Sequence, residues 1–135
     1  MLGVKPYISF GGNCEEAVNF YKDVLGAEIL FIQKVGDSPM KGMGAPDEAV
    51  MHSTLKIGDT HVMMSDNMSG PLNVGNNISL AIGSDDIDSA TTMFNRMAEG
   101  GNVLMPLQET FWAERFGMVT DKFGINWMFN CDLKQ

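Results

Sequence analysis

The sequence is poor in the residues that usually build a metal centre, a redox site or a membrane span. It has two cysteines and two histidines in 135 residues, and neither cysteine belongs to a Cys-x-x-Cys pair. We interpret Cys14 and Cys131, which lie far apart in the chain, as free thiols of a reducing compartment. No apolar run approaches the ~18 residues that cross a membrane, and the stretch MLGVKPYISF shows no basic segment followed by an apolar run and a cleavage site, so we expect no signal peptide. We therefore expect a cytoplasmic protein with no membrane partner.

Basic residues are also scarce. Nine Lys and Arg stand against 17 Asp and Glu, which gives a formal net charge of −8. The basic residues are scattered rather than gathered in a stripe, so we expect no nucleic-acid partner. Methionine, by contrast, is abundant, with 12 copies in the chain. Its flexible thioether fills irregular cores or adaptable binding surfaces.

An internal repeat organises the chain. The stretch NCEEAVNFYKDVLG reads as a helix with Asn13 as N-cap, Glu16 completing a capping box and Gly26 at the C-terminal end. The stretch DIDSATTMFNRMAEGG predicts a second helix, with Asp86 as its N-cap. The apolar stripe of the second helix lies 73 residues after that of the first. The paired positions are Ala17, Phe20, Tyr21, Val24 and Leu25, and then Ala90, Met93, Phe94, Met97 and Ala98.

Strand signals surround both helices in the same order. Each helix has one alternating strand before it and three after it, and the last two are joined by a turn. The pattern predicts an α+β fold of two βαβββ modules, about 1–69 and 72–135, that together make one domain. A long irregular stretch, about 34–49, separates the second and third strands of the first module.

Three stretches resemble a known family: PYISFGGNCEEAVNFYKDVLGAE, MHSTLKIGDTHVMMSD and TFWAERFGMVTDKFGINWMFN. They are similar to the vicinal oxygen chelate superfamily (glyoxalase, bleomycin resistance and dioxygenase proteins), and most of all to its PhnB-like branch. The resemblance implies a cupped eight-stranded mixed sheet with helices on the outer face, an internal cavity and a homodimer. It also implies a divalent metal in many members, held by His, Glu or Gln from the first and fourth strand of each module.

The ligand positions of that superfamily map onto residues that suit such a metal poorly. Alternation along the strands places Lys5, Val62, Asn77 and Met128 there. Valine cannot ligate, lysine is a cation and methionine suits soft metals. We therefore predict no glyoxalase-type metal and no cofactor, although a divalent metal with non-standard ligands such as His52, His61 and Glu114 stays open. A register shifted by one residue would present His61 in place of Val62.

The same alternation yields a candidate cavity. We expect Ile78, Leu80, Ile82, Trp127 and Phe129 to pack under the second helix. The cavity candidates are Lys5, Tyr7, Ser9, Val62, Met64, Asn77, Ser79, Asn126 and Met128, joined by Trp112 and Phe116 from the segment before the seventh strand.

Three kinds of function remain open on these residues. The first is the binding of a small organic molecule in the cavity, which we favour because the usual ligands are missing. The second is metal-independent acid or base chemistry with Lys5 or Tyr7. The third is a lyase, isomerase or dioxygenase that uses a metal with non-standard ligands.

Overall fold

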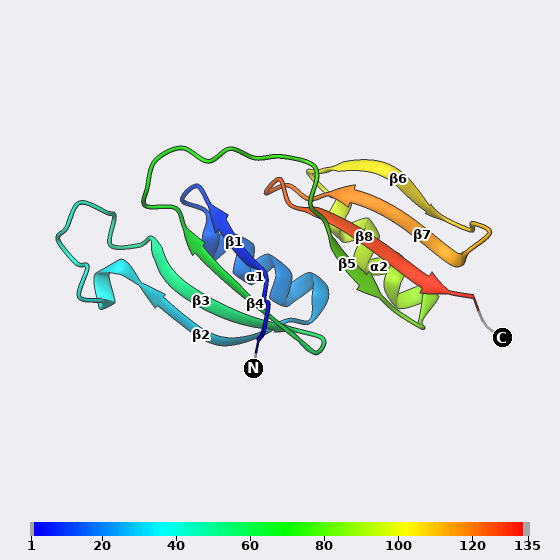
Figure 1. Cartoon of the computed structure of the whole chain (residues 1–135), viewed down its shortest axis with the longest axis horizontal. Helices are drawn as coiled ribbons and strands as arrows, with labels where there is room; N and C mark the ends of the chain where they lie inside the picture. The colour runs from blue at the N-terminus through cyan, green and yellow to red at the C-terminus, as the bar shows by residue number, and fades with distance from the viewer. Residues whose placement is uncertain (1, 134–135) are drawn as a thin grey trace. The chain divides into compact units, whose positions relative to one another are not determined.

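Two compact units follow each other along the chain, and each has the same order of elements (Figure 1). The computed structural model describes residues 2–133. The first unit ends at Asn73 and the second begins at Val74. Each contains a strand, an α-helix and three more strands, and the eight strands form two four-stranded mixed sheets. The predicted α+β fold of two βαβββ modules is confirmed. Within residues 2–133, no helix is long and apolar enough to cross a membrane.

The first unit is built from β1 (Tyr7–Phe10), α1 (Cys14–Leu25), β2 (Glu28–Lys34), β3 (Val50–Ile57) and β4 (Thr60–Asp66). The sheet order is β1-β4-β3-β2, with β1 parallel to β4 and the other neighbours antiparallel. Helix α1 packs against one face of this sheet (Figure 1). A short 3-10 turn, η1 (Val35–Asp37), opens the long connection from β2 to β3.

The start of α1 differs from the prediction. The side chain of Asn13 makes no capping hydrogen bond. Instead, the Asp66 carboxylate at the end of β4 accepts hydrogen bonds of 2.9 Å from the backbone N–H groups of Gly12 and Cys14. Its other oxygen accepts one of 2.8 Å from Val50 N–H at the start of β3. A carboxylate distant in sequence therefore binds the first N–H group of α1 and the N–H of Gly12 just before the helix, in place of a local side-chain cap.

The second unit is built from β5 (Leu80–Gly83), α2 (Ile87–Ala98), β6 (Asn102–Gln108), β7 (Ala113–Thr120) and β8 (Asn126–Asp132). Its sheet order is β5-β8-β7-β6, which repeats the arrangement of the first unit. Here the predicted cap is confirmed, because Asp86 Oδ1 accepts a hydrogen bond of 3.1 Å from Ser89 N–H.

The predicted apolar layer under α2 is confirmed for β8. Trp127 and Phe129 are buried, and the Phe129 ring meets that of Phe94 edge to face at 5.5 Å. The prediction was wrong for Ile78, which is 77% exposed and precedes β5. The Asn126 amide donates to the Ile78 carbonyl oxygen at 3.2 Å, so this segment is held by a side chain and not by strand pairing.

The two closing hairpins have turns of different length. Two residues separate the paired Ile57 and Thr60 in the first unit, whereas five separate Thr120 and Asn126 in the second. Successive side chains of a strand point to opposite faces, so a difference of three residues exchanges the faces of β4 relative to β8. The sequence prediction assumed that Gly58 and Gly124 occupy equivalent places in the two turns. Because the turns differ in length, that assumption assigns the side chains of β4 to the wrong faces.

Candidate functional site

The face of the first sheet that lies away from α1 gathers polar and aromatic side chains. Residues paired across the strands share a face, and Tyr7 and Thr54 both pair with Met63, Ser9 pairs with Ser65, and Lys56 pairs with His61. We call this surface the first open face. Its members are Tyr7, Ser9, Glu28, Phe31, Gln33, His52, Thr54, Lys56, His61, Met63 and Ser65.

Val62 and Met64 do not belong to it. They are 3% and 0% exposed, and they share the α1 side with Leu55 and with Ser53, whose side chain contacts the Cys14 thiol. The prediction that Val62 and Met64 face the cavity was therefore wrong by one residue of register. The short turn at Gly58 is the physical reason, and His61 takes the place assigned to Val62.

Three rings and three hydroxyl groups meet on the first open face. The His52 ring lies 6.0 Å from the Tyr7 ring and 6.1 Å from the Phe31 ring, measured between centroids. The Tyr7 and Ser65 hydroxyls share a hydrogen bond of 2.8 Å, and Thr54 Oγ1 lies 3.4 Å from His52 Nε2. The position of His52 beside Thr54 agrees with the sequence pattern. Ser65 was missed because the face of β4 was assigned incorrectly, and Phe31 was missed because its place depends on the pairing of β2 with β3.

Charged groups of both signs lie on the first open face. Lys56 and His61 lie opposite each other on β3 and β4, and Lys5 precedes β1 by two residues. Within the four described strands, the one carboxylate on this face is Glu28 at the start of β2, opposite Lys56. The strands of this face thus carry one lysine and one carboxylate, in a chain where 17 acidic residues stand against nine Lys and Arg.

The second sheet also has a face away from its helix. Ala81, Met118 and Met128 are aligned across β5, β7 and β8, and Phe116 pairs with Asn130. We call these five residues the second open face. Met128 lies on the predicted side, opposite to Trp127 and Phe129. The Trp112 ring, 46% exposed, meets the rings of Phe111 and Phe116 at 4.8 and 5.5 Å.

The polar cavity candidates of the second unit are Asn77, Ser79 and Asn126, and they are less available to bind a ligand. The Asn126 side chain is 9% exposed and is occupied, since its oxygen accepts from Thr120 Oγ1 at 2.8 Å and its nitrogen donates to two backbone carbonyls. Asn77 and Ser79 precede β5 in an irregular segment, with Asn77 exposed. Asn126 therefore acts as a structural residue that fixes the entry into β5.

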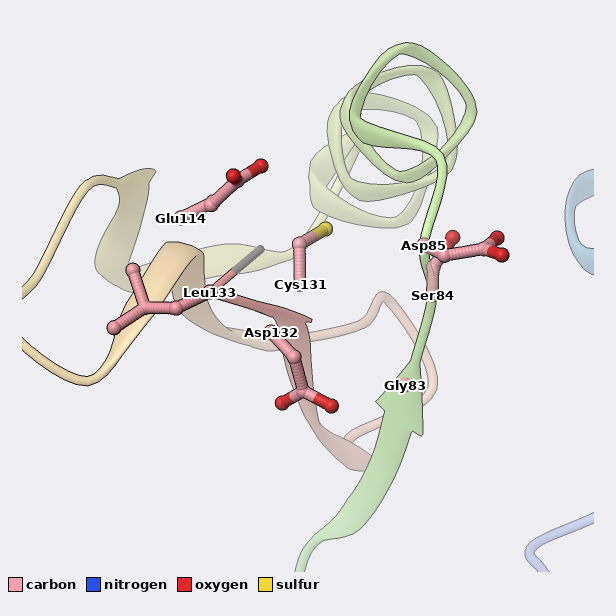
Figure 2. A pocket seen from close by; sticks show the side chains of 7 residues that line it. All are labelled: Gly83, Ser84, Asp85, Glu114, Cys131, Asp132 and Leu133. Atoms are coloured by element: carbon pink, nitrogen blue, oxygen red, sulfur yellow. The ribbon is translucent and has the colours of Figure 1, made fainter. Parts of the chain in front are cut away.

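A hollow of 550 Å3 lies at one end of the second unit, between β5, β7 and β8 (Figure 2). Asp85, Glu114 and Asp132 line it, but their carboxylates point in different directions. Cys131 also lines it, and burial raises the pKa of this thiol, with the Glu114 charge adding to the shift. The thiol is therefore protonated at neutral pH and is a poor nucleophile.

The donor groups at the superfamily's metal positions fit a divalent ion poorly. With the register of β4 corrected, these positions hold Lys5, His61, Asn77 and Met128. One imidazole, an amide, a thioether and an ammonium do not form the His and carboxylate set that zinc, nickel or manganese prefers. Among residues 2–133, no three His, Cys, Asp or Glu side chains are grouped to hold an ion.

Comparisons with known proteins cover both units. The family model of the Glyoxalase/Bleomycin resistance protein/Dioxygenase superfamily matches residues 3–129. Protein YjdN of Escherichia coli K12 is 37% identical, over 96% of this chain and 95% of YjdN. The crystal structure of protein PA1353 from Pseudomonas aeruginosa is 39% identical with a TM-score of 0.87, over 99% of this chain and 100% of that one. The PhnB protein from Bacillus cereus is 26% identical with a TM-score of 0.80, over 96% and 99%.

Proposed function

Because the chain belongs to the glyoxalase/bleomycin resistance protein/dioxygenase superfamily, we propose that it binds a small organic anion on the first open face without a glyoxalase-type metal. One observation carries this proposal. The Tyr7, Phe31 and His52 rings lie together with hydroxyl groups, on the same face of the sheet as the Lys56 ammonium group. Such a surface matches a planar molecule with a carboxylate or a similar group.

Each group has a distinct role in this proposal. The rings of Tyr7 and Phe31 offer apolar contact on either side of His52. Lys56 and Lys5 attract the anion, and the Tyr7–Ser65 hydroxyl pair supplies a hydrogen bond that fixes its orientation. Ser9 is a further polar candidate on the first open face. In the second unit, considered by itself, the proposed ligand-binding candidates are Asn77, Ser79, Trp112, Phe116 and Met128.

A thermal-shift screen against small organic acids tests the proposal. A bound anion raises the melting temperature of the wild type, because it stabilises the folded state alone. Replacing Lys56 with Gln should weaken this binding by about tenfold, which corresponds to ~1.4 kcal/mol. Lys22→Gln on α1 removes the same charge from the other side of the sheet and serves as the matched control. Equal affinities of the two variants would contradict the proposal.

The competing function is catalysis on the same face. The hydrogen-bonded Tyr7 hydroxyl beside His52 is the feature that favours acid or base chemistry, and Lys5 is the second candidate. Any acid that stabilises the protein should therefore be recovered after incubation and analysed by mass spectrometry. Recovery unchanged supports binding, whereas a product that Tyr7→Phe fails to form supports an enzyme.

Elemental analysis of protein purified without chelators tests the proposal that the site holds no glyoxalase-type metal. We expect substoichiometric zinc, nickel and manganese, because the donor set is poor. One equivalent of any of them, lost in His61→Ala, would establish a metalloenzyme with non-standard ligands and would refute a metal-free site.

Self-association and location complete the proposal. We propose a cytoplasmic homodimer. The outer strand β2 leaves Leu30, Phe31 and Ile32 between 38% and 48% exposed, and such an edge favours pairing with a second copy. Light scattering at micromolar concentration should give the mass of a dimer, and a monomeric mass would refute it.

A further inference from the structure

A second pocket lies under the long loop of the first unit. Its lining is mostly apolar, unlike the polar first open face. It encloses 520 Å3, and four of the 12 methionines line it: Met40, Met43, Met51 and Met68. They come from the loop after η1, from the start of β3 and from the segment after β4. No charged side chain lines the pocket, and Asn67 supplies its one polar side chain among the described lining residues.

Core packing does not explain these thioethers. Met40, Met43 and Met68 are 47%, 70% and 47% exposed, whereas Met64 and Met97 are fully buried in the cores of their units. A methionine that fills a core loses its contact with water. Three of the four pocket thioethers instead keep that contact at the pocket wall.

The backbone of the loop holds two of the four methionines at the ends of one turn. Met43 N–H donates to the Met40 carbonyl oxygen at 3.2 Å, which closes a turn with the two methionines at its ends. Gly42 and Gly44 on either side of Met43 have φ of 80° and 105°, a region that other residues rarely adopt. The position of Met43 is therefore set by two glycines as well as by the turn.

We propose that this pocket is a thioether site for a soft monovalent ion, Cu(I). A thioether is a neutral, polarizable donor that selects Cu(I) over hard cations. The pocket has no carboxylate or imidazole, which zinc, magnesium and calcium require. Binding of Cu(I) to thioethers releases no proton and changes no oxidation state. The site therefore needs neither a base nor a redox partner. The proposal does not depend on the function assigned to the first open face.

Anaerobic titration of the full chain with Cu(I), in competition with the chromophoric chelator bicinchoninate, tests the site. The wild type should hold one equivalent. Replacing all four methionines with Leu keeps the volume and apolar character of the pocket and removes its sulfur. We expect at least a hundredfold loss of affinity. The control replaces Met93, Met105, Met118 and Met128 of the second unit with Leu, and it should bind like the wild type.

Two results would overturn the proposal. Equal affinity in the wild type and the pocket variant would assign the ion to the thiols of Cys14 and Cys131, which both proteins keep. Absence of Cu(I) binding, together with uptake of a neutral apolar dye that the Leu variant retains, would make the pocket a site for apolar molecules. If the fourfold variant does not fold, Met43→Leu alone should lower the affinity at least threefold. In addition, Ag(I) should shift the NMR signals of these four methionine methyl groups and of no others.

Discussion

The two units share one arrangement of strands and helix but hold it with different polar contacts. In the first unit, the buried carboxylate of Asp66 joins the start of α1 to the start of β3. In the second, Asp86 caps α2 locally, and the buried carboxylate of Asp121 serves the hairpin turn, accepting from Phe123 N–H, Ile125 N–H and Trp127 Nε1. The two units therefore share their apolar pattern, whereas the hydrogen bonds of their buried carboxylates and helix caps differ.

The packing between helix and sheet differs in the same way. In the first unit, Ser53 of β3 pairs with Met64 of β4. The Ser53 side chain contacts the Cys14 thiol at the start of α1. The residue that pairs with Phe129 in the second unit is Gly117, and the Phe94 ring lies directly over it. The second sheet thus lacks a side chain where the Phe94 ring packs, whereas the first sheet keeps the Ser53 side chain at its contact with α1.

The largest effect is expected at Asp66. Asp66→Ala leaves three backbone N–H groups at the α1 and β3 starts without an acceptor, two of them in buried hydrogen bonds. At ~1–3 kcal/mol for each buried donor, the free energy of unfolding should fall by about 4 kcal/mol. Urea denaturation measures this loss. A change below about 1 kcal/mol would show that water replaces the carboxylate.

The next effect is expected at Gly117. A Cβ at this position would lie 2.8 Å from the Phe94 ring and 2.9 Å from Leu107 Cα, so Gly117→Ala forces the ring or the strand to move. Overpacking of this kind costs about 2–3 kcal/mol. The double variant Gly117→Ala, Phe94→Leu should recover part of that loss, because the smaller side chain makes room. No recovery in thermal or urea unfolding would place the strain in the backbone instead.

Alkaline pH tests the burial of the Cys14 thiol in the first unit. Burial, with the nearby Asp66 charge, raises the pKa of Cys14 from 9.0 to about 12. Between these values the unfolded thiol ionises and the folded thiol does not, so the folded state loses relative stability as pH rises. The decline should approach ~1.4 kcal/mol per pH unit above pH 9, and below that pH this thiol contributes no slope. Urea unfolding of Cys14→Ala between pH 8 and 11 should show a shallower decline, and an equal decline would rule out Cys14 as its source.

The smallest effects compare the two helix starts. Asp86→Ala removes the local cap of α2 and should cost about 1 kcal/mol. Asn13→Ala should cost less than about 0.3 kcal/mol, since the Asn13 side chain caps nothing and stands exposed. Equal losses in both variants would show that Asn13 caps α1 in solution, and they would weaken the contrast between the units.

The sequence was sufficient for the features that depend on apolar periodicity. The repeat predicted both helices, the order of the strands and the burial of Trp127 and Phe129, because these follow from side-chain spacing within one element. It failed for Val62 and Met64, where the face of a strand depends on the length of the preceding turn. Counting the residues between the paired strands would have corrected them, since two and five differ by an odd number.

The contacts that join segments distant in sequence could not be predicted from apolar periodicity. Asn13 has the right chemistry for a cap, and nothing local in the sequence shows that Asp66, 53 residues later, takes its place. The convergence of Phe31, His52 and Tyr7 on one face likewise requires the pairing of β1 through β4 with β3 and β2. These sites depend on tertiary pairing, which local periodicity does not specify.

The N–H group of Cys14, at the start of α1, is bound by the last residue of β4, which the ribosome adds long after the helix itself. In a nascent chain that ends before Asp66, water is the acceptor left for this amide, while α2 carries its own acceptor one residue ahead of it. During synthesis the second helix therefore emerges with its cap in place, and the first gains this hydrogen bond only after β4 is made.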